Sequence, residues 1–136
     1  MSIVLHKGGC HCGKIKFEVQ ASEILECLRC NCSVCHKKQN IHFIVPKTKF
    51  RLLEGEDNLT TYTFNTHQAK HTFCRICGVQ SFYIPRSNPE GVGVMPHCID
   101  GSTIKGIKIE DYDGKNWEQS IKTEKGLKVQ AFSKES

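Results

Sequence analysis

The sequence lacks any run of 18 apolar residues, which excludes a helix that spans a membrane. It also lacks a charged segment followed by an apolar stretch near its start, so no secretory signal is visible. No internal repeat, low-complexity tract or proline-rich linker divides the 136 residues. We therefore expect an intracellular protein, cytoplasmic or nuclear, made of one domain over residues 1–136 with a loose tail from about residue 126.

Apolar residues are also scarce, at 38% of the chain, which predicts a modest hydrophobic core. The sequence compensates with nine cysteines. An odd number of cysteines without a secretory signal argues against a disulfide framework. The cysteines are therefore predicted to be reduced thiols that bind metal, and metal binding would add the stability that a small core lacks.

The basic charge balance is weak evidence for a nucleic-acid partner. The net charge of +5 arises in residues 1–50, which carry eight Lys or Arg against three Glu, whereas the rest of the chain is neutral in sum. Four thiolates around Zn²⁺ carry a net charge of −2 and three carry −1, so two such sites would reduce the total to +2. Charge alone therefore does not indicate a polyanion as partner.

Alternating patterns predict an all-β protein. Lys14 to Gln20 places Ile15, Phe17 and Val19 on one side and polar residues on the other, as in a half-buried strand. Only Ser33–Asn40 and Lys115–Lys125 could be helical, and helices this short could not cover both faces of a parallel sheet. We therefore expect a mostly antiparallel fold with one or two short helices. Further strands are predicted at Ile24–Cys30, Ile41–Val45, Leu59–Phe64, Lys70–Cys74, Val79–Ile84 and Val92–Cys98.

Seven of the nine cysteines fall into three tight clusters. These are the C-x-C-G of Cys10 and Cys12, the C-x-C-x-x-C of Cys30, Cys32 and Cys35, and the C-x-x-C-G of Cys74 and Cys77. A C-x-C on an extended chain projects both sulfurs from one face, and the turn of a C-x-x-C-G aims two sulfurs at one point. The first and last clusters together would make a closed structural zinc site. The alternative is two unrelated pairs of buried cysteines.

The central cluster has only three cysteines, and an open fourth position distinguishes catalytic from structural zinc sites. Three thiolates donate so much charge that the metal becomes a feeble Lewis acid towards water. Such a site suits the binding and delivery of another thiolate better than hydrolysis. A fourth protein ligand would instead close the site. The candidates for that ligand are Cys27, His36, His97 and Cys98, although Cys27 points away from the cluster on a strand and is better suited to the core.

Other residues near the clusters have weaker interpretations. Lys37, Lys38 and Arg86 could attract an anionic ligand, or could be solvated surface charges. His36 and His97 are candidate general acids on sequence grounds alone. The C-x-x-C-H at Cys32 matches a haem-attachment motif, but haem attachment normally follows export, and a thioredoxin-like redox pair would need a βαβ setting that this region lacks.

The three clusters in this order resemble the family of glutathione-dependent formaldehyde-activating enzymes. The likeness covers roughly residues 5–130, and it is closer still to the domain of centromere protein V. The segments that carry this nearer likeness are His42–Pro46, Thr60–His67, His71–Cys74, Gln80–Tyr83, Pro85–Pro89 and Pro96–Cys98. Centromere protein V carries a basic extension before this domain, whereas this sequence begins almost at the domain, so a role on microtubules, chromatin or nucleic acid is not expected.

The resemblance implies a tent-like, Mss4-like β-fold stabilised by two zinc ions. By position, Cys10, Cys12, Cys74 and Cys77 match the family's structural zinc ligands, and Cys30, Cys32 and Cys35 match its catalytic zinc ligands. The implied reaction joins glutathione, a small thiol, to formaldehyde, a small carbonyl, and makes the protein a carbon–sulfur lyase of the S-(hydroxymethyl)glutathione synthase type. The alternative is a zinc-stabilised module that binds protein or chromatin without chemistry.

Overall fold

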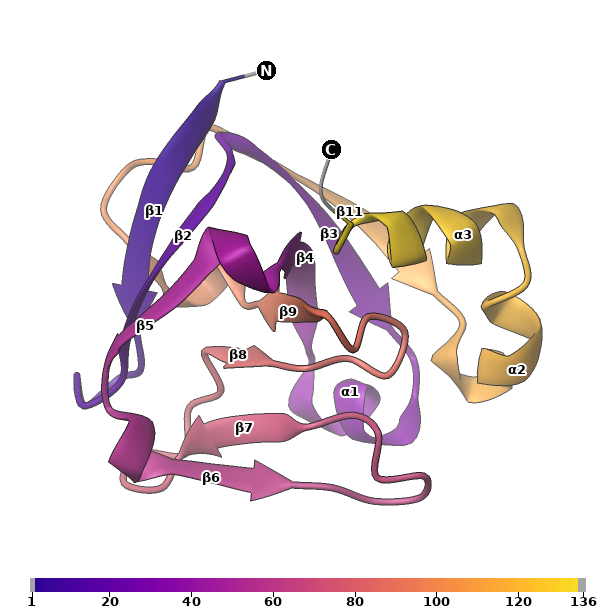
Figure 1. The fold of residues 1–136 in the computed structure, drawn as a ribbon, viewed down its shortest axis with the longest axis horizontal. Helices are drawn as coiled ribbons and strands as arrows, with labels where there is room; N and C mark the ends of the chain where they lie inside the picture. The colour runs from indigo at the N-terminus through magenta and orange to yellow at the C-terminus, as the bar shows by residue number, and fades with distance from the viewer. Residues whose placement is uncertain (1, 135–136) are drawn as a thin grey trace.

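The computed structural model describes residues 2–134, which form three β-sheets and a few short helices (Figure 1). The four-stranded sheet has the order β10–β1–β2–β5, with β1 Ile3–Gly9, β2 Lys16–Ser22, β5 Phe50–Glu54 and β10 Ile99–Asp100. The five-stranded sheet has the order β11–β3–β4–β9–β8, with β3 Ile24–Cys30, β4 Ile41–Pro46, β8 Phe82–Tyr83, β9 Gly91–Val94 and β11 Gly106–Tyr112. The third sheet is a hairpin of β6 Leu59–Tyr62 and β7 His71–Cys74.

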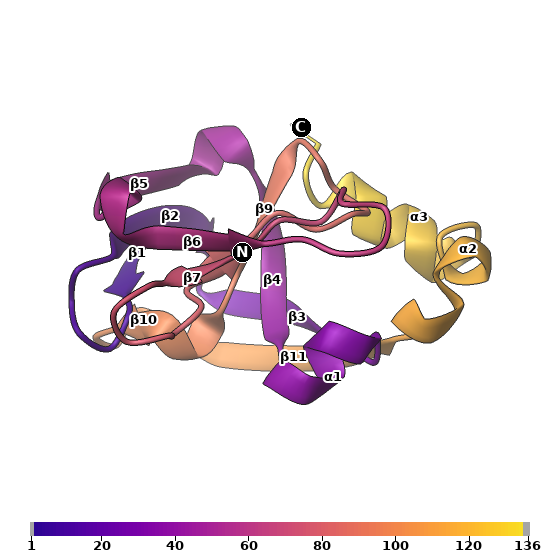
Figure 2. The ribbon, with the colours of Figure 1, turned by 90° about the horizontal axis from the view of Figure 1, so that it is seen from below.

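The α-helices are short and lie beside the five-stranded sheet. Helix α1 (Ser33–Lys38) follows β3, and α2 (Trp117–Ser120) and α3 (Glu124–Ala131) follow β11. The four-stranded sheet lies at one end of the molecule and α2 and α3 lie at the other, as two perpendicular views agree (Figures 1 and 2). Within residues 2–134, no helix is long and apolar enough to cross a membrane.

The predicted mostly antiparallel β-fold with short helices is confirmed. The alternation predicted for Lys14–Gln20 is confirmed: Phe17 and Val19 of β2 and Ile15, just before it, are almost completely buried. Their side chains join those of β4 and β9 in one core cluster, so the two larger sheets share a hydrophobic core. Apolar burial at alternate positions therefore orients β2 as the sequence pattern requires.

One strand pair is parallel, and it determines what surrounds the central cysteine cluster. Strand β11 pairs with β3 from Gly106 opposite Ile24 to Tyr112 opposite Cys30. Because the two strands end together, the turn that follows β11 lies against the cysteines that follow β3. Gly114 follows closely after Tyr112, which pairs with Cys30. The pairing therefore brings Gly114 to the central cluster, although 84 positions separate it from Cys30 in the sequence.

Several strand predictions differ from the structure at their ends. The strand predicted at Val79–Ile84 is only Phe82–Tyr83, and the one predicted at Val92–Cys98 ends at Val94. Pro96 explains the second difference, because it begins a 3-10 turn that ends the extended chain. The prediction did not include β1, β5, β10 or β11.

The predicted loose tail from about residue 126 is wrong for the residues that the structure describes. Residues 124–131 form α3, which begins with Thr123 accepting a hydrogen bond from the Gly126 N–H. Val129 is buried, and the side chain of Asn88 donates hydrogen bonds to the carbonyl of Val129 at 2.8 Å and to the Ser133 hydroxyl at 2.8 Å. The polar composition of this segment reflects an exposed helix face, while Val129 on the other side packs in a cluster with Leu28, Ile44 and Tyr112 of the five-stranded sheet.

Candidate functional site

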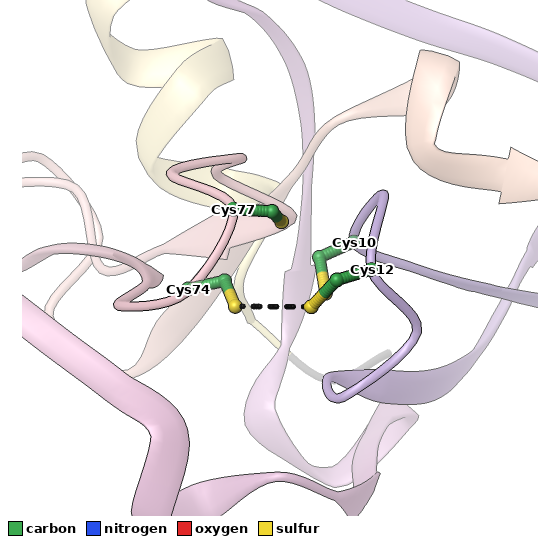
Figure 3. Close-up of side chains that lie close together, drawn as sticks. All are labelled: Cys10, Cys12, Cys74 and Cys77. Carbon is green, nitrogen blue, oxygen red and sulfur yellow. Dashed lines mark hydrogen bonds between the residues drawn. The ribbon is translucent and has the colours of Figure 1, made fainter.

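The first and last cysteine clusters meet in space, and their four sulfurs face one another (Figure 3). All four Sγ atoms lie within 4.8 Å of each other, and both the Cys10–Cys12 and the Cys12–Cys74 sulfur pairs are 3.6 Å apart. A disulfide would require about 2.05 Å, and all nine cysteines are free. Zn–S bonds of about 2.3 Å place the corners of a tetrahedron roughly 3.8 Å apart. The spacing and the thiol donors therefore fit a closed tetrahedral metal site.

The two glycines that close these motifs have the backbone conformation that the turns require. Gly13 has φ of 83° and Gly78 has φ of 78°, a region that side chains other than glycine rarely adopt. The N–H of Gly78 donates to the carbonyl of Cys74 at 2.8 Å, which closes the turn of the C-x-x-C-G. Each turn thus presents its two sulfurs to the same point.

Backbone N–H groups point at the sulfurs of this cluster and favour the thiolate form of Cys74 and Cys77. The N–H of Ile15 donates to Cys10 Sγ at 3.3 Å, and that of Ile76 donates to Cys74 Sγ at 3.4 Å. Backbone hydrogen bonds to its sulfur lower the pKa of the Cys77 thiol to about 6. A metal ion binds thiolates, so this backbone arrangement prepares the cluster for metal.

The central cluster places Cys30, Cys32 and Cys35 within 4.8 Å of one another by their Sγ atoms. Cys30 ends β3, Cys32 precedes α1, and Cys35 lies in the helix, where it is buried. Hydrogen bonds with the thiols of Cys30 and Cys35 lower the pKa of Cys32, whereas hydrogen bonds with Cys30 and Cys32 raise the pKa of Cys35. The three thiols together could hold a metal ion.

No fourth Cys, His, Asp or Glu joins this group among residues 2–134. Cys27 lies in the hydrophobic core, and Cys98 is buried with its Sγ donating to the carbonyl of Gln80 at 3.6 Å. His36 and His97 are exposed. None of the four candidates for a fourth ligand is therefore part of the three-sulfur group.

The three sulfurs instead line a cleft of about 490 Å³. That volume is within the range of small-molecule sites, which is about 300–1,000 Å³. Neither His36 nor His97 lines it, nor do Lys37 and Lys38, whereas Arg86 does. The other lining side chains include His42, Phe64, His71, Tyr83, Tyr112, Lys115, Trp117 and Glu118.

A buried chain of hydrogen bonds connects Cys35 to Tyr83 through Asn40 and His42. The Asn40 amide nitrogen donates to Cys35 Sγ at 3.5 Å, and its oxygen lies 3.0 Å from His42 Nδ1. Because that oxygen can only accept, Nδ1 carries the proton of the neutral imidazole. His42 Nε2 then accepts from the Tyr83 hydroxyl at 3.0 Å. Burial lowers the pKa of His42 to about 4, which keeps this ring neutral at pH 7.

His71 provides a second imidazole in the cleft. Its ring stacks between Phe64 and Tyr83, with centroid distances of 5.7 and 5.1 Å, so its orientation is fixed. The Nδ1 atom is buried and has no hydrogen-bond partner among the described residues. Burial also lowers the pKa of His71, which leaves a neutral ring available to a ligand.

Gly114 lies directly against the central cluster. A Cβ built on it would stand 2.4 Å from Cys30 Sγ and 2.9 Å from Cys32 Cβ, closer than real Cβ contacts. Gly114→Ala is therefore expected to displace Cys30 Sγ and weaken metal binding at this cluster by at least about tenfold. Metal content after dialysis against a competing chelator measures the loss, which should spare the four-cysteine site.

Gly106→Ala is the matched control, because a Cβ there would meet only the Ile24 side chain at 3.8 Å. It lies on the same strand that leads to Gly114 and should retain metal at both clusters. Equal metal retention by both alanine variants would contradict the assigned role of Gly114.

A family model described as glutathione-dependent formaldehyde-activating enzyme matches residues 5–114. The chain belongs to this family. The match extends as far as Gly114 and covers all seven clustered cysteines. It therefore includes both the four-cysteine and the three-cysteine group of this family member.

A solved structure supports the fold assignment. A crystal structure of a Rhodobacter sphaeroides protein, determined as a structural genomics target, is 38% identical to this family member with a TM-score of 0.64. The similarity covers 70% of this chain and 88% of that one. Nothing in these comparisons points specifically to centromere protein V, so that nearer likeness stays a prediction.

The structure brings the seven predicted cysteines of this family member into one group of four and one of three. The sequence patterns did not indicate that five other residues lie beside the central group: His42, Tyr83, Tyr112, Gly114 and Trp117. A histidine inside the otherwise apolar stretch Ile41–Val45 was the one available signal, because a buried polar side chain needs a partner. The others come to the cleft through long-range strand pairing that no local pattern indicates.

Proposed function

We propose that this protein is a zinc-dependent enzyme of the carbon–sulfur lyase type that acts on glutathione and formaldehyde, or on a similar thiol and small carbonyl. In the forward direction the thiol sulfur bonds to the carbonyl carbon, and the proton from sulfur ends on the carbonyl oxygen. The reverse reaction breaks the same bond. The observation that carries the proposal is a three-sulfur cluster, with no fourth protein ligand among residues 2–134, that lines a cleft of small-molecule size.

We assign two zinc ions, one to each cluster. Cys10, Cys12, Cys74 and Cys77 would hold the structural ion, and Cys30, Cys32 and Cys35 the catalytic one. Bound to the three sulfurs, Zn²⁺ would lower the pKa of a substrate thiol and hold its sulfur in the cleft. A reaction that uses a reduced thiol also favours an intracellular location, in cytoplasm or nucleus.

The chain's own residues supply orientation and proton handling. Asn40 donates to Cys35 Sγ and so orients that sulfur. His71, whose Nδ1 has no partner and whose ring is fixed by stacking, accepts the thiol proton at Nδ1 and returns it to the carbonyl oxygen. The phenyl and phenol rings of Phe64 and Tyr83 cover the reacting atoms and exclude water.

The exchange of formaldehyde onto glutathione tests this function. Zinc-loaded protein is expected to accelerate the interconversion of free formaldehyde and S-hydroxymethylglutathione. The rate of this interconversion is measured by NMR exchange spectroscopy. Cys32→Ser should return the rate to that of buffer, because it removes one sulfur of the open cluster. Cys98→Ser is the matched control, since Cys98 is a buried cysteine outside both clusters, and it should keep the acceleration. A wild-type rate equal to that of buffer would remove the proposal.

The alternative, a binding module without chemistry, predicts a second metal site that is indifferent to added thiol. Cobalt substitution distinguishes the two, because a new sulfur ligand changes the visible absorption of Co²⁺. Within the family, we place this chain nearest to the domain of centromere protein V, on the segments from His42–Pro46 to Pro96–Cys98. That likeness concerns the domain and carries no assignment of a chromatin partner.

A further inference from the structure

Arg86 occupies an unusual position in the cleft. Its guanidinium carbon lies 3.7 Å from the centroid of the Trp117 ring, and its side chain is only 23% exposed. Its Nε atom is buried and has no hydrogen-bond partner among the described residues. Its ion pair with Glu118 is long, at 3.5 Å, and the Glu118 side chain is 81% exposed. The guanidinium is thus fixed in a plane, with one buried donor unused.

The surrounding side chains have unused polar groups of the same kind. Three of the five buried polar atoms without a partner belong to residues that line this cleft: His71 Nδ1, Arg86 Nε and the Tyr112 hydroxyl. Lys115 adds a second basic side chain to the lining, in which Glu118 is the one carboxylate. Buried polar groups without partners are rare in folded proteins. Their concentration in one cleft indicates a polar, anionic ligand.

A carboxylate is the group that best fits a fixed guanidinium. Two parallel N–H donors of arginine match the two carboxylate oxygens, and stacking on an aromatic ring holds the fork in place. The side-on edge of the fork consists of Nε, which has no partner among the described residues, and Nη2, whose bond to the exposed Glu118 is long enough, at 3.5 Å, for a ligand carboxylate to replace. The guanidinium and the three cysteines line the same cleft, so one molecule can present a carboxylate to Arg86 and a thiol to the sulfur cluster.

We propose that Arg86, held flat on Trp117, is the carboxylate-binding group of the thiol site, and that it selects thiols bearing a carboxylate over neutral thiols. The inference rests on the proposed function for the identity of the reacting thiol. It adds a specificity-determining residue to that function. The affinity for a carboxylate-bearing thiol should exceed that for a neutral thiol of similar size by roughly ten- to a hundredfold.

Trp117 makes the test direct, because it is the one tryptophan in the chain and lies beneath the guanidinium. Zinc-loaded protein is titrated with 3-mercaptopropionate and with 2-mercaptoethanol, while tryptophan fluorescence and calorimetry report binding. Arg86→Gln should reduce the affinity for 3-mercaptopropionate to that for 2-mercaptoethanol. Arg86→Lys should recover only part of it, since an ammonium keeps the charge but loses the fork. Arg51→Gln, an exposed arginine on β5, is the control and should match wild type.

The outcomes separate this inference from the proposed function. Unchanged discrimination in Arg86→Gln, with formaldehyde exchange intact, would overturn the role of Arg86 and leave the function standing. Complete recovery by Arg86→Lys would overturn the fork geometry. S-methylglutathione keeps the carboxylates but has no free thiol. If it binds in an Arg86-dependent manner while wild type accelerates no exchange, the carboxylate site stands and the proposed function falls.

Discussion

Replacing Cys74 by serine is expected to lower the free energy of unfolding by about 4 kcal/mol or more in zinc-loaded protein. Cys74 is completely buried, and its sulfur lies 3.6 Å from that of Cys12, which is 62 residues away. A crosslink that closes a loop of this length removes about 4 kcal/mol of unfolded-state entropy by the disulfide estimate. Domains are stable by only about 5–15 kcal/mol. Loss of the crosslink should therefore remove a large share of the stability.

The position of the cluster explains why the effect should be global. Cys10 and Cys12 follow β1 in the four-stranded sheet, and Cys74 ends β7 in the hairpin sheet. A metal ion held by all four cysteines would tie these two sheets together beside the shared core. For a chain of this length, a loss of about 4 kcal/mol corresponds to a fall in Tm of roughly 15 °C.

Thermal unfolding of wild type and variants, with and without a strong chelator, measures the effect. Cys98→Ser is again the control, because it changes a buried cysteine that can keep its hydrogen bond to the Gln80 carbonyl as a serine. The chelator should lower the Tm of wild type and of Cys98→Ser, and should change Cys74→Ser much less. Equal Tm values for the two serine variants, or a wild type indifferent to chelator, would show that no metal crosslink stabilises the fold.

The sequence was sufficient for those parts of the molecule that depend on local spacing. The C-x-C-G and C-x-x-C-G motifs place their sulfurs by turn geometry, so the four-cysteine group could be predicted without knowing the sheets. The alternation around Phe17 was equally local, because a strand with one buried face must have it. Local patterns also predicted α1, whose bounds are Ser33–Lys38.

The rest depends on contacts between distant segments. Strand β11 alternates apolar and polar residues, but its apolar residues Ile107 and Ile109 are about half exposed. The position of β11 beside β3 is therefore set by the backbone pairing of the two strands and not by burial of these side chains. That pairing alone brings Gly114 to Cys30. The packing of α3 depends on Asn88, which lies 41 residues before its partner Val129. No periodicity within either segment could have indicated these contacts.

Acidification is expected to destabilise the protein through His42, by about 2 kcal/mol between pH 7 and pH 5. The ring is buried, with 2% of its surface exposed, and burial lowers its pKa from 6.5 to about 4. The unfolded chain therefore binds a proton between these two values while the folded protein does not. This contribution to stability is fully present above pH 6.5 and is lost as the pH falls from 6.5 towards 4.

The hydrogen bonds of His42 suit the neutral ring that burial already favours. Its Nδ1 donates to the Asn40 oxygen, and its Nε2 accepts from the Tyr83 hydroxyl, so both nitrogens are satisfied in the neutral ring. Protonation would place a second N–H against the Tyr83 hydroxyl in a site closed to water. The maximum loss, for a shift of this size, is about 3 kcal/mol.

Unfolding by urea across pH 5–7.5 isolates this contribution when wild type is compared with His42→Gln. Glutamine does not titrate, so the slope of the unfolding free energy with pH should be shallower in the variant by the equivalent of about 2 kcal/mol over this range. The slope is the readout, because the substitution itself changes the level of stability. Proton competition for the cysteine sulfurs contributes to both proteins alike and cancels in the difference.

His67→Gln, which changes an exposed histidine, should keep the wild-type slope. Parallel slopes for wild type and His42→Gln would mean that His42 carries a proton in the folded protein, and the direction of its hydrogen bond with Tyr83 would then be reversed.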